Sequence, residues 1–446
     1  MLCAGAPEPV LSLRRVWLRP RRGRNETARR SLTIGYTALM RVLYFAPRIA
    51  WPIISGAHLR DFYFAKYLAD KAELTYVGLV TEEGEKQAEL LRGQLGQRVQ
   101  VIAVQRDTAY RRSNIVRGMI GPTPLNVLNF TSPRVLAEVE RIFREQSFDT
   151  VQVESMHLIA YARRIRQLAP QTRLILDWHN IESEILARYA EKDSNPLRRI
   201  YAQRTSTLSR GVEDELLRLC HAHTVCSERE REGLHARVPG ARIEVVGNGV
   251  DCEFFAVNSA PVRERRDVLF MGRMDYHANV DAALFFVDAV WPLIQARRPE
   301  LRLVIVGAQP AKAILALRGR GITVTGTVDD VRPYYQSALT SVVPLRVGGG
   351  TRLKVLEAMA AGTPVISTTL GAEGLAITPG KDILIADSPQ AMAETVVSLR
   401  AGSPQWSEIA SNGHRLVETT YDWSVVGEIL WQLHTELVSS GAATVR

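Results

Sequence analysis

Short apolar runs alternate with longer amphipathic segments along almost the whole chain, and this alternation restricts the fold more than any other feature. The apolar runs are continuous in Val, Ile and Leu, as expected for parallel strands covered by helices on both faces. Each amphipathic segment is long enough for the helix that joins two parallel strands. Because 446 residues are too many for one ordinary core, we expect two doubly wound α/β domains in tandem.

Each half of the chain carries its own set of expected strands. In the first half they are Val42–Phe45, Leu74–Leu79, Val99–Ala103, Thr150–Glu154, Arg173–Asp177 and Ala222–Cys226. In the second half they are Val268–Met271, Leu303–Val306, Ile322–Thr325, Thr340–Val343, Pro364–Ser367 and Ile383–Ala386. Helices are expected around Leu59–Ala69, Arg134–Glu145, Leu158–Gln167, Glu213–Leu219 and Ala282–Ala296. Ligands of such sheets bind beyond the carboxyl ends of the strands, so the loops after each strand are searched for a site.

A polar stretch without apolar periodicity, Asn258–Arg266, marks the expected domain boundary. We therefore predict a basic extension at 1–39, a first domain at 40–255, a second at 256–418 and a C-terminal helix at 419–446. The extension holds eight arginines and two glutamates and so carries most of the net charge of +9. We interpret it as an unstructured extension or a start site placed too early. A nucleic-acid contact confined to this tail is the alternative, and we predict no nucleic-acid partner.

The remaining composition argues against several classes of protein. No run approaches the roughly 20 apolar residues that span a bilayer, and the basic N-terminal segment lacks the apolar core of a secretory signal. The four cysteines, Cys3, Cys220, Cys226 and Cys252, have neither metal-ligand nor disulfide spacing. A reducing cytoplasm is the simplest setting for them.

The strongest chemical signal lies between Val342 and Thr369. There the sequence passes from a strand through three glycines, Gly348–Gly350, into a helix that begins near Thr351 and ends at Gly362. Glycines let backbone N–H groups approach a ligand closely. A helix N-terminus adds unpaired donors and a partial positive charge. This arrangement predicts a site for an anion such as a diphosphate.

Charged residues follow the glycines in the first turns of that helix. Arg352 and Lys354 are expected to be mobile cations, although cations oppose the helix dipole there unless an anion neutralises them. Glu357 lies on the same face one turn beyond Lys354, where it could accept hydrogen bonds from a ribose diol. The alternative is a flexible glycine loop followed by a solvated Lys354–Glu357 pair.

The segment resembles the nucleotide-sugar site of the retaining glycosyltransferases of group 1 and family 4. Their GT-B fold has two Rossmann-like α/β domains facing a cleft and a C-terminal helix that crosses back to the first domain. The resemblance covers about residues 41–435. Its other landmarks follow in order: Asn248-Gly-Val-Asp251, Phe270-Met-Gly-Arg273, Leu303–Gly307, Gly326-Thr-Val-Asp-Asp330 and Tyr421-Asp-Trp423.

The resemblance implies roles for individual residues. Glu357 matches the ribose-binding carboxylate, and Arg273 matches the diphosphate-binding arginine. Gly349 stands where the family usually has a sugar-facing glutamate, and Ala278 where a lysine is common, so we expect backbone amides and Lys354 to replace these contacts. Arg352 is the alternative to Lys354. The predicted nucleotide-sugar-binding residues are Gly56, Arg273, Val328, Gly348, Gly349, Gly350, Thr351, Lys354 and Glu357.

His179 in the first half lies directly after an expected strand. A lone loop histidine is most often structural, but this position resembles the family loop whose histidine reaches the donor sugar and phosphate. Asn180 and Glu182 could orient it or contact the substrate. Glu154 also ends a strand, where a capping role is equally open, and His58 is interpreted as a helix-start residue. The predicted catalytic residues are His179, Arg273 and Lys354.

These features predict a hexosyltransferase that retains configuration and uses a UDP- or GDP-linked sugar. The acceptor is expected to be a glycan, a lipid-linked molecule or a small molecule, in cell-surface or exopolysaccharide synthesis. A non-catalytic nucleotide-sugar-binding protein and a GT-B-fold epimerase or phosphorylase remain alternatives. No cofactor or metal is expected, since Asp329-Asp330 is interpreted as a helix cap rather than an Asp-x-Asp metal site. Residues in Tyr110–Phe130 fit peripheral contact with the inner face of a membrane or, equally, a packed segment between domains.

Overall fold

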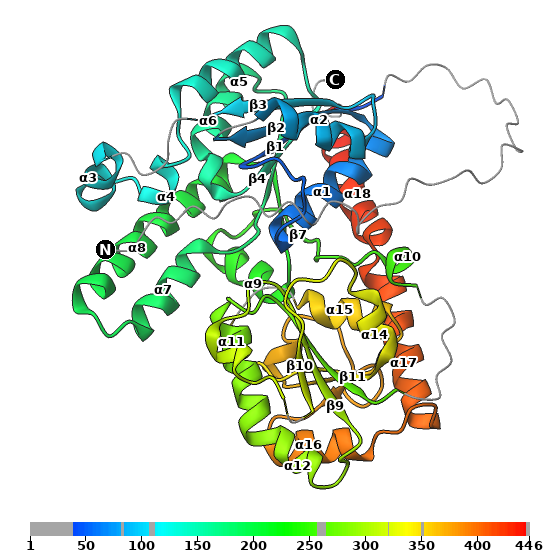
Figure 1. Cartoon of the computed structure of the whole chain (residues 1–446). Coiled ribbons are helices and arrows are strands. Elements are labelled where there is room, and N and C mark those ends of the chain that lie inside the picture. Colours follow the sequence, from blue (N-terminus) through cyan, green and yellow to red (C-terminus); the bar gives the residue numbers. More distant parts are fainter. Residues whose placement is uncertain are drawn as a thin grey trace, which may run out of the picture. The chain divides into compact units, whose positions relative to one another are not determined.

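The computed structural model describes residues 39–81, 84–106, 112–256, 265–319, 321–348 and 352–442. The described residues form two compact units, one containing the chain up to Asn248 together with the segment from Trp423, the other Gly249–Asp422. Each unit has one parallel sheet with helices around it (Figure 1). The predicted α/β fold class with two Rossmann-like sheets is confirmed. Residues 1–38, most of the predicted extension, lie outside the described part.

The first unit is built on a seven-stranded sheet in the order β3-β2-β1-β4-β5-β6-β7. Its strands are β1 (Arg41–Ala46), β2 (Glu73–Val80), β3 (Gln100–Gln105), β4 (Thr150–Glu154), β5 (Arg173–Asp177), β6 (Ala222–Val225) and β7 (Ile243–Val245). Only β7 was not anticipated, because it has three residues and no apolar run. Its helices include α1 (Gly56–Lys71), α2 (Gly84–Leu95), α3 (Arg112–Ile120), α4 (Leu125–Leu128), α5 (Pro133–Glu145), α6 (Ile159–Leu168) and α9 (Glu228–Arg237).

The first unit contains a long helical hairpin, of which the sequence predicted only the last turns. Helix α7 (Glu182–Lys192) packs against α8 (Pro196–Leu219), which begins far before the expected helix at Glu213. The side chain of Asn195 caps α8 by accepting hydrogen bonds from the backbone N–H groups of Leu197 and Arg198. The first turns of α8 are largely exposed, and their few apolar residues do not form the continuous stripe that would reveal a helix.

Helix α18 (Trp423–Ala442) belongs to the first unit although it follows the second unit in sequence. The ring of Trp423 stacks on that of Tyr63 with centroids 4.8 Å apart. Further along, the hydroxyl of Tyr67 donates a hydrogen bond of 2.5 Å to Glu428. These contacts with α1 confirm the predicted return of the C-terminal helix to the N-terminal half.

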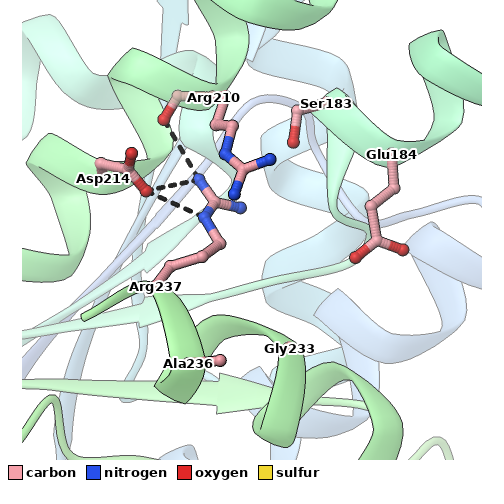
Figure 2. A pocket seen from close by; sticks show the side chains of 7 residues that line it. All are labelled: Ser183, Glu184, Arg210, Asp214, Gly233, Ala236 and Arg237. Carbon is pink, nitrogen blue, oxygen red and sulfur yellow. Dashed lines mark hydrogen bonds and ion pairs between the residues drawn. The ribbon is translucent and has the colours of Figure 1, made fainter. Parts of the chain in front are cut away.

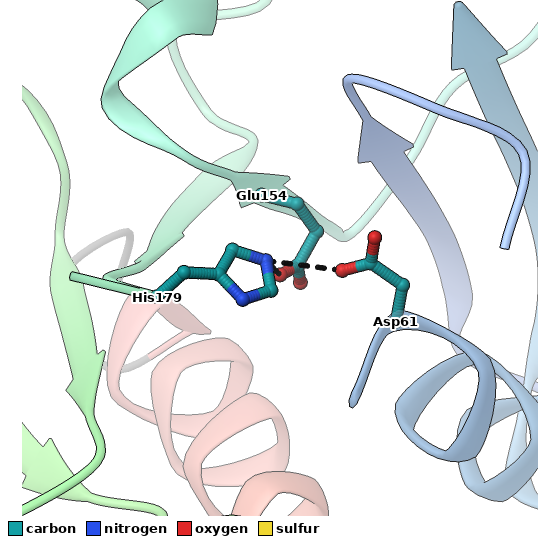
Figure 3. Close-up of side chains that lie close together, drawn as sticks. All are labelled: Asp61, Glu154 and His179. Atoms are coloured by element: carbon teal, nitrogen blue, oxygen red, sulfur yellow. Dashed lines mark ion pairs between the residues drawn. The ribbon is translucent and has the colours of Figure 1, made fainter. Parts of the chain in front are cut away.

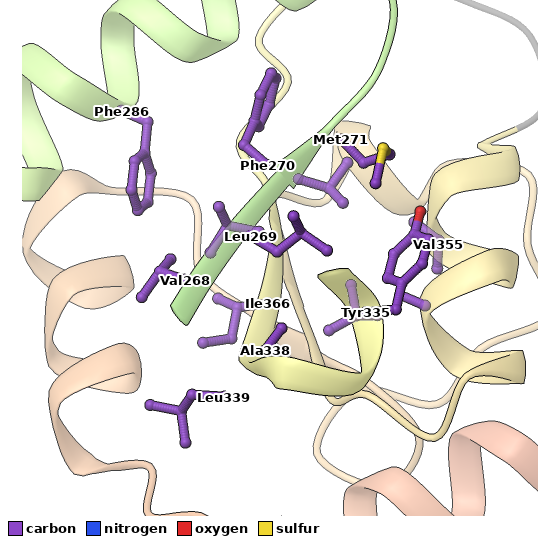
Figure 4. Packing of buried hydrophobic residues seen from close by; sticks show 14 of the residues in the cluster. Val268, Leu269, Phe270, Met271, Phe286, Tyr335, Ala338, Leu339, Val355 and Ile366 are labelled. Atoms are coloured by element: carbon purple, nitrogen blue, oxygen red, sulfur yellow. The ribbon is translucent and has the colours of Figure 1, made fainter. Parts of the chain in front are cut away.

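The second unit has a six-stranded parallel sheet in the order β10-β9-β8-β11-β12-β13. Its strands are β8 (Asp267–Met271), β9 (Arg302–Val306), β10 (Ile322–Val324), β11 (Ala338–Val343), β12 (Val365–Ser367) and β13 (Leu384–Ile385). Its helical segments include α11 (His277–Phe285), η3 (Phe286–Val290), α12 (Trp291–Gln295), α14 (Arg332–Ser337), α15 (Leu353–Ala360), η4 (Leu370–Ala372), α16 (Pro389–Ser398) and α17 (Pro404–Leu416). Strand β8 lies in the middle of the buried core, to which Leu269, Phe270 and Ile366 all belong (Figure 4).

The order of the strands fixes where a ligand can bind in each unit. In both sheets the chain starts at an inner strand, builds outward in one direction and then continues on the other side of that strand. The direction therefore reverses between β1 and β4 and between β8 and β11, and crevices at such reversals are the usual binding sites. No helix of the described residues is both long and apolar enough to cross a bilayer.

Candidate active site

The loops that follow β8 and β11 in the second unit pack against each other. Gly348 has a φ of 115°, in the left-handed region that favours glycine. A Cβ atom at Gly348 would lie 3.1 Å from Cβ of Ala278 and 3.9 Å from the hydroxyl of Tyr276. The glycine loop thus reaches the loop after β8, as the predicted site requires. Gly349, Gly350 and Thr351 lie outside the described residues, so their roles stay predictions.

The amino group of Lys354 lies at the carboxyl end of β8. Its Nζ atom donates a hydrogen bond of 2.6 Å to Oδ1 of Asn279 and lies 5.1 Å from the centroid of the Phe270 ring. A Cβ atom at Gly272 would come within 2.9 Å of the same Nζ. Burial lowers the pKa of Lys354 to about 7, although the carboxylate of Glu357 opposes this shift. Lys354 therefore places its amino group beside the segment that follows β8, in which Ala278, at the start of α11, stands where the sequence comparison led us to expect a lysine.

Arg352 is not the mobile cation that its position at the start of a helix suggested. Its side chain is only 6% exposed and donates hydrogen bonds to the carbonyl oxygens of Gly348 and Leu370. Burial lowers its pKa. The guanidinium therefore ties the glycine loop to η4, and the buried carbonyls replace the water that would otherwise solvate it.

Glu357 is oriented by a residue that the sequence did not reveal. The hydroxyl of Tyr335, on α14, donates a hydrogen bond of 2.8 Å to Oε2 of Glu357. Tyr335 is fully buried, which fixes its position in the core (Figure 4). Burial raises the pKa of Glu357, while the hydrogen bond from Tyr335 and the charge of Lys354 oppose the shift. No described residue donates a hydrogen bond to Oε1 of Glu357, which suits it for a ligand hydroxyl.

Arg273 follows β8 and is held by two neighbouring side chains. Its guanidinium makes a bidentate pair with Asp275, at 3.1 and 2.6 Å, and donates a 3.1 Å hydrogen bond to Gln309. About half of the Arg273 side chain is exposed. An anion can therefore approach it, in competition with Asp275. Val328, expected near the nucleobase, is half-buried in the loop after β10 and packs against the core.

In the first unit, Gly56 is the first residue of α1 and is exposed. Ser55 caps this helix, accepting a hydrogen bond from the N–H of His58. The Nδ1 atom of His58 lies 2.8 Å from the hydroxyl of Ser55, so His58 is a helix-start residue. The first turn of α1 follows β1, where the strand order of the sheet changes direction between β1 and β4. Its backbone N–H groups are therefore candidates to bind a ligand of this sheet.

His179, after β5, lies against a cluster of buried carboxylates (Figure 3). Its Nε2 atom is 3.1 Å from Oδ1 of Asp61, 3.2 Å from Oε2 of Glu154 and 3.9 Å from Oδ2 of Asp177. The three carboxylates are 0% exposed and the His179 side chain is 13% exposed. Glu154 therefore does not cap a helix but contacts the histidine. Asp61 was not anticipated, since it lies in the middle of a helix and no loop pattern points to it.

Two arginines balance part of this negative charge. Arg60 forms a bidentate pair with Asp177, at 2.9 and 2.6 Å, and also donates to the carbonyl oxygens of Val246 and Gly247. Arg48 donates a 2.9 Å hydrogen bond to Oδ2 of Asp61. The network therefore joins α1, β5 and the segment after β7 around one buried cluster.

The donor atoms of Asp61, Glu154 and His179 lie within 4.8 Å of one another, which is compact enough to surround a cation. No Asp-x-Asp sequence contains this set, because its members come from α1, β4 and the loop after β5. Arg48 already neutralises Asp61, however, and a bound divalent ion would lie close to that guanidinium. We therefore interpret the cluster as an ion-pair network centred on His179.

A separate polar pocket of about 470 Å³ lies among α7, α8 and α9 (Figure 2). The guanidinium of Arg237 on its wall is bonded to Asp214 at 2.6 and 2.9 Å and to the carbonyl oxygen of Arg210 at 3.1 Å. The pocket is not at the carboxyl end of a strand, and none of the predicted site residues lines it. It does not belong to the site predicted from sequence.

Models of known protein families match a segment in each half of the chain. A family model described as "Glycosyltransferase Family 4" matches residues 88–254, and one described as "Glycosyl transferases group 1" matches residues 265–401. A phosphatidyl-myo-inositol mannosyltransferase of Mycobacterium tuberculosis is 29% identical over 212 residues, which cover 44% of this chain and 55% of that protein. An uncharacterized 44.6 kDa protein in the cps region of Klebsiella pneumoniae is 26% identical over 165 residues, or 35% and 42% of the two chains. The matches thus span about half the length of these curated relatives.

Solved structures show the same fold over most of the chain. Anabaena HepE in complex with UDP superposes with a TM-score of 0.64 at 15% identity, covering 89% of this chain and 100% of that one. Sucrose-phosphate synthase from Thermosynechococcus elongatus gives a TM-score of 0.64 at 17% identity, covering 90% and 100%. At such low identity the likeness shows the fold alone, which is of the GT-B type.

Proposed function

Because this chain belongs to the group 1 and family 4 glycosyltransferases of GT-B fold, we propose that it transfers a hexose-type sugar from a nucleotide-sugar donor with retention of configuration. The observation that carries the proposal is the convergence at the reversal between β8 and β11. There the amino group of Lys354 lies beside Gly272 and Asn279. Glu357, one helical turn away, is held by Tyr335 with one oxygen left for a ligand.

We assign the donor contacts as follows. Arg273, Lys354 and the loop Gly348–Thr351 bind the diphosphate, and their positive charges stabilise it as it leaves. Glu357 binds the ribose hydroxyls, and Val328 lies beside the base. On this proposal the cations do the work of a metal, so activity should survive chelation.

In the first unit, we propose that Gly56 and His179 bind the phosphate and the sugar of the donor. Residues 40–255 would form the acceptor-side domain, and 256–418 the nucleotide-sugar domain. The glycosidic bond would break through an oxocarbenium-like state, with the acceptor attacking from the same face. The position of His179 shortly after the end of β5 supports this role, since ligands of such sheets bind beyond the carboxyl ends of the strands.

Names of relatives guide the choice of substrates to test. One relative is a mannosyltransferase acting on phosphatidyl-myo-inositol, one lies in a cps region, and the HepE structures include complexes with UDP and with UDP-glucose. We propose a UDP- or GDP-linked donor and a glycan or lipid-linked acceptor, in surface polysaccharide synthesis at the cytoplasmic side of a membrane.

An exposed apolar surface supports contact with that membrane. On α3, Val116, Met119 and Ile120 are 55%, 55% and 80% exposed, and at the start of α8 Leu197 and Ile200 are 77% and 60% exposed. These two helix ends lie on one surface, because Arg204, one turn after Ile200, donates hydrogen bonds to the carbonyl oxygens of Gly118 and Gly121. Tyr110 and Arg111 of the predicted contact segment lie outside the described residues.

The membrane contact is tested by sedimentation with vesicles. We expect binding to vesicles that contain anionic lipid, and a loss of binding in Ile120→Glu and Leu197→Glu. Leu90→Glu, at an exposed apolar residue on α2, is the matched control and should bind as the original protein does. Equal binding by all three variants would contradict this surface.

The function itself is tested with a panel of UDP-, GDP- and ADP-sugars, with and without glycan and lipid-linked acceptors. A transferase forms glycosylated product only with acceptor, whereas an epimerase converts the donor without it. A nucleotide-sugar-binding protein is stabilised by the donor and turns over nothing. If Glu357→Ala and Arg273→Ala both leave donor turnover intact, the proposed site is wrong.

A further inference from the structure

His179 is contacted by carboxylates from two separate elements, Asp61 on α1 and Glu154 at the end of β4. Asp61 also has Arg48 as a partner, at 2.9 Å. Glu154 has no arginine or lysine contact among the described residues, and its two oxygens lack a hydrogen-bond partner there. An ionised carboxylate that is fully buried is strongly destabilising without a positive partner. The imidazole ring is the group placed to supply that charge.

The remaining groups around the ring do not replace this partner. Asp177, on β5, is a third carboxylate near Nε2, and its own charge is matched by Arg60, the neighbour of Asp61 on α1. Two more histidines lie near enough to interact with His179, His58 on α1 and His157 on η1 (Met156–Leu158). Burial lowers the pKa of both, so they are neutral at neutral pH.

Glu182, the first residue of α7, is the remaining acidic group that interacts with the ring. Burial raises its pKa. With Asp177 paired to Arg60 and Asp61 paired to Arg48, a positive ring on His179 balances Glu154. Burial and the charge of Asp177 raise the pKa of Glu154 to about 7, and the contact with His179 opposes that shift, so a positive ring favours the ionised carboxylate.

We propose that Asp61 and Glu154 are positioning residues that hold His179 as an imidazolium, so that its second ring N–H presents a permanent positive charge to an anionic group of the substrate. The other ring nitrogen, Nδ1, points away from both carboxylates (Figure 3). No described residue forms a hydrogen bond with that nitrogen. This inference rests on the proposed function, in which His179 contacts the donor, and it specifies the chemical form of that contact.

The electrostatics of the cluster agree with this geometry. Burial by itself would lower the pKa of His179, but the charge of Asp61, the side-chain contacts with Asp61 and Glu154 and the charge of Asp177 outweigh it and raise the pKa to about 10. Burial opposes ionisation of Asp61, yet His179 and Arg48 lower its pKa overall. An imidazolium held in this way cannot serve as a general base near neutral pH. It stabilises negative charge instead, as preorganised donors do.

The charge of the ring is measured by NMR on protein labelled with ¹⁵N-histidine and treated with EDTA. The signal of His179 is the one missing in His179→Gln. We expect both ring nitrogens of His179 to remain protonated from about pH 6 to about pH 9, well above the ordinary histidine pKa of about 6.5. A neutral ring at pH 7.5 in the unsubstituted protein would overturn the proposal.

The carboxylates are tested by Asp61→Asn and Glu154→Gln, each of which keeps shape and removes one charge. Each should move the deprotonation of His179 down by about 1–3 pH units. Glu140→Gln, whose carboxylate pairs with Arg164 on the surface, is the control and should leave the His179 signal unchanged. Far-UV circular dichroism checks folding, and either carboxylate variant suffices if the other does not fold. Unshifted signals in a folded variant would contradict the proposed role.

Two further measurements separate this proposal from its alternatives. The ratio of kcat/KM for Glu154→Gln to that of the unsubstituted enzyme should fall as pH rises, because other titrating groups cancel in the ratio. A ratio independent of pH would count against the imidazolium. Loss of the Nε2 proton on addition of Zn²⁺ or Mn²⁺ would show a cation site and overturn it. If the protein turns over no nucleotide sugar, the proposed function fails, while the NMR result still decides the charge of the ring.

Discussion

Lys354 and Asn279 meet across the reversal of the second sheet, with Nζ of Lys354 2.6 Å from Oδ1 of Asn279. One residue comes from α15, after β11, and the other from α11, after β8. The amide orients the amino group without neutralising it. The charge on Lys354 is therefore available to an anionic ligand at the carboxyl end of β8.

Replacing Lys354 tests whether this charge acts on the diphosphate. We expect Lys354→Gln to lower kcat/KM for the donor about a hundredfold, the range for loss of one preorganised group that stabilises developing charge. Lys354→Arg should retain more activity, because it keeps the charge. Asn279→Ala, which removes only the orienting amide, should have a smaller effect. Steady-state kinetics with the donor that the nucleotide-sugar panel selects decide the order of the three variants.

The lowered pKa of Lys354 predicts a pH dependence. In the proposed function protonated Lys354 binds the diphosphate, so kcat/KM should fall as pH rises through about 7. A bound anion favours the charged form, and kcat should therefore fall only at higher pH. Lys354→Arg should lack this inflection, since arginine stays protonated. An unchanged inflection in that variant would assign it to another group.

The same shift has a consequence for stability. Folding favours the neutral form of Lys354, so between pH 7 and the ordinary value of 10.5 the unfolded chain binds more protons than the folded one. The contribution of this group to stability is therefore unfavourable below pH 7 and improves as pH rises through that window. Urea unfolding at several pH values should show less of this rise in Lys354→Met.

Tyr335 should matter for donor binding although it is buried. Tyr335→Phe removes the 2.8 Å hydrogen bond that orients Glu357, and we expect donor affinity to fall about five- to tenfold, corresponding to roughly 1 kcal/mol. Tyr334→Phe is the neighbouring control and should bind the donor normally. Calorimetric titration with the nucleotide diphosphate gives the comparison. Equal affinity in all three proteins would show that Glu357 needs no such support.

Two arginines offer a matched test of buried against exposed ion pairs. Arg60 and Asp177 are 1% and 0% exposed, whereas Arg163 and Glu215 are 49% and 43% exposed. We expect Arg60→Met to lower the free energy of unfolding by about 3–5 kcal/mol, because it leaves a buried carboxylate unpaired. Arg163→Met should cost roughly 1 kcal/mol or less. Urea denaturation measures both.

Two helical glycines test the packing of α18. A Cβ atom at Gly427 would lie 2.3 Å from the ring of Tyr67, whereas one at Gly211 in α8 would meet nothing within 4 Å. Gly211→Ala should therefore stabilise the protein by about 0.5–1 kcal/mol through helix propensity alone. Gly427→Ala should destabilise it, since α1 and α18 would have to move apart. A shift of the same sign in both variants would contradict the close contact.

The sequence by itself determined the α/β class, most strand positions and the loops in which a site should be sought. It did so because apolar runs, helix caps and glycines act over a few neighbouring residues. Gly348, Lys354 and Glu357 were predicted as site residues for that reason, since they belong to one strand–loop–helix segment. The early start of α8 was missed because its first turns are largely exposed and present no continuous apolar stripe.

Only the tertiary structure decided which distant residues meet and which charges are buried. Asp61 reaches His179 because β1, β4 and β5 lie next to one another, an order that no local pattern encodes. Arg352 and Lys354 are two positions apart, yet one ties down backbone carbonyls and the other lies beside Asn279. Their difference comes from what packs around each side chain. The whole fold determines which polar groups surround a buried charge. Those groups decide whether the charged side chain holds the backbone in place or is available to bind a ligand.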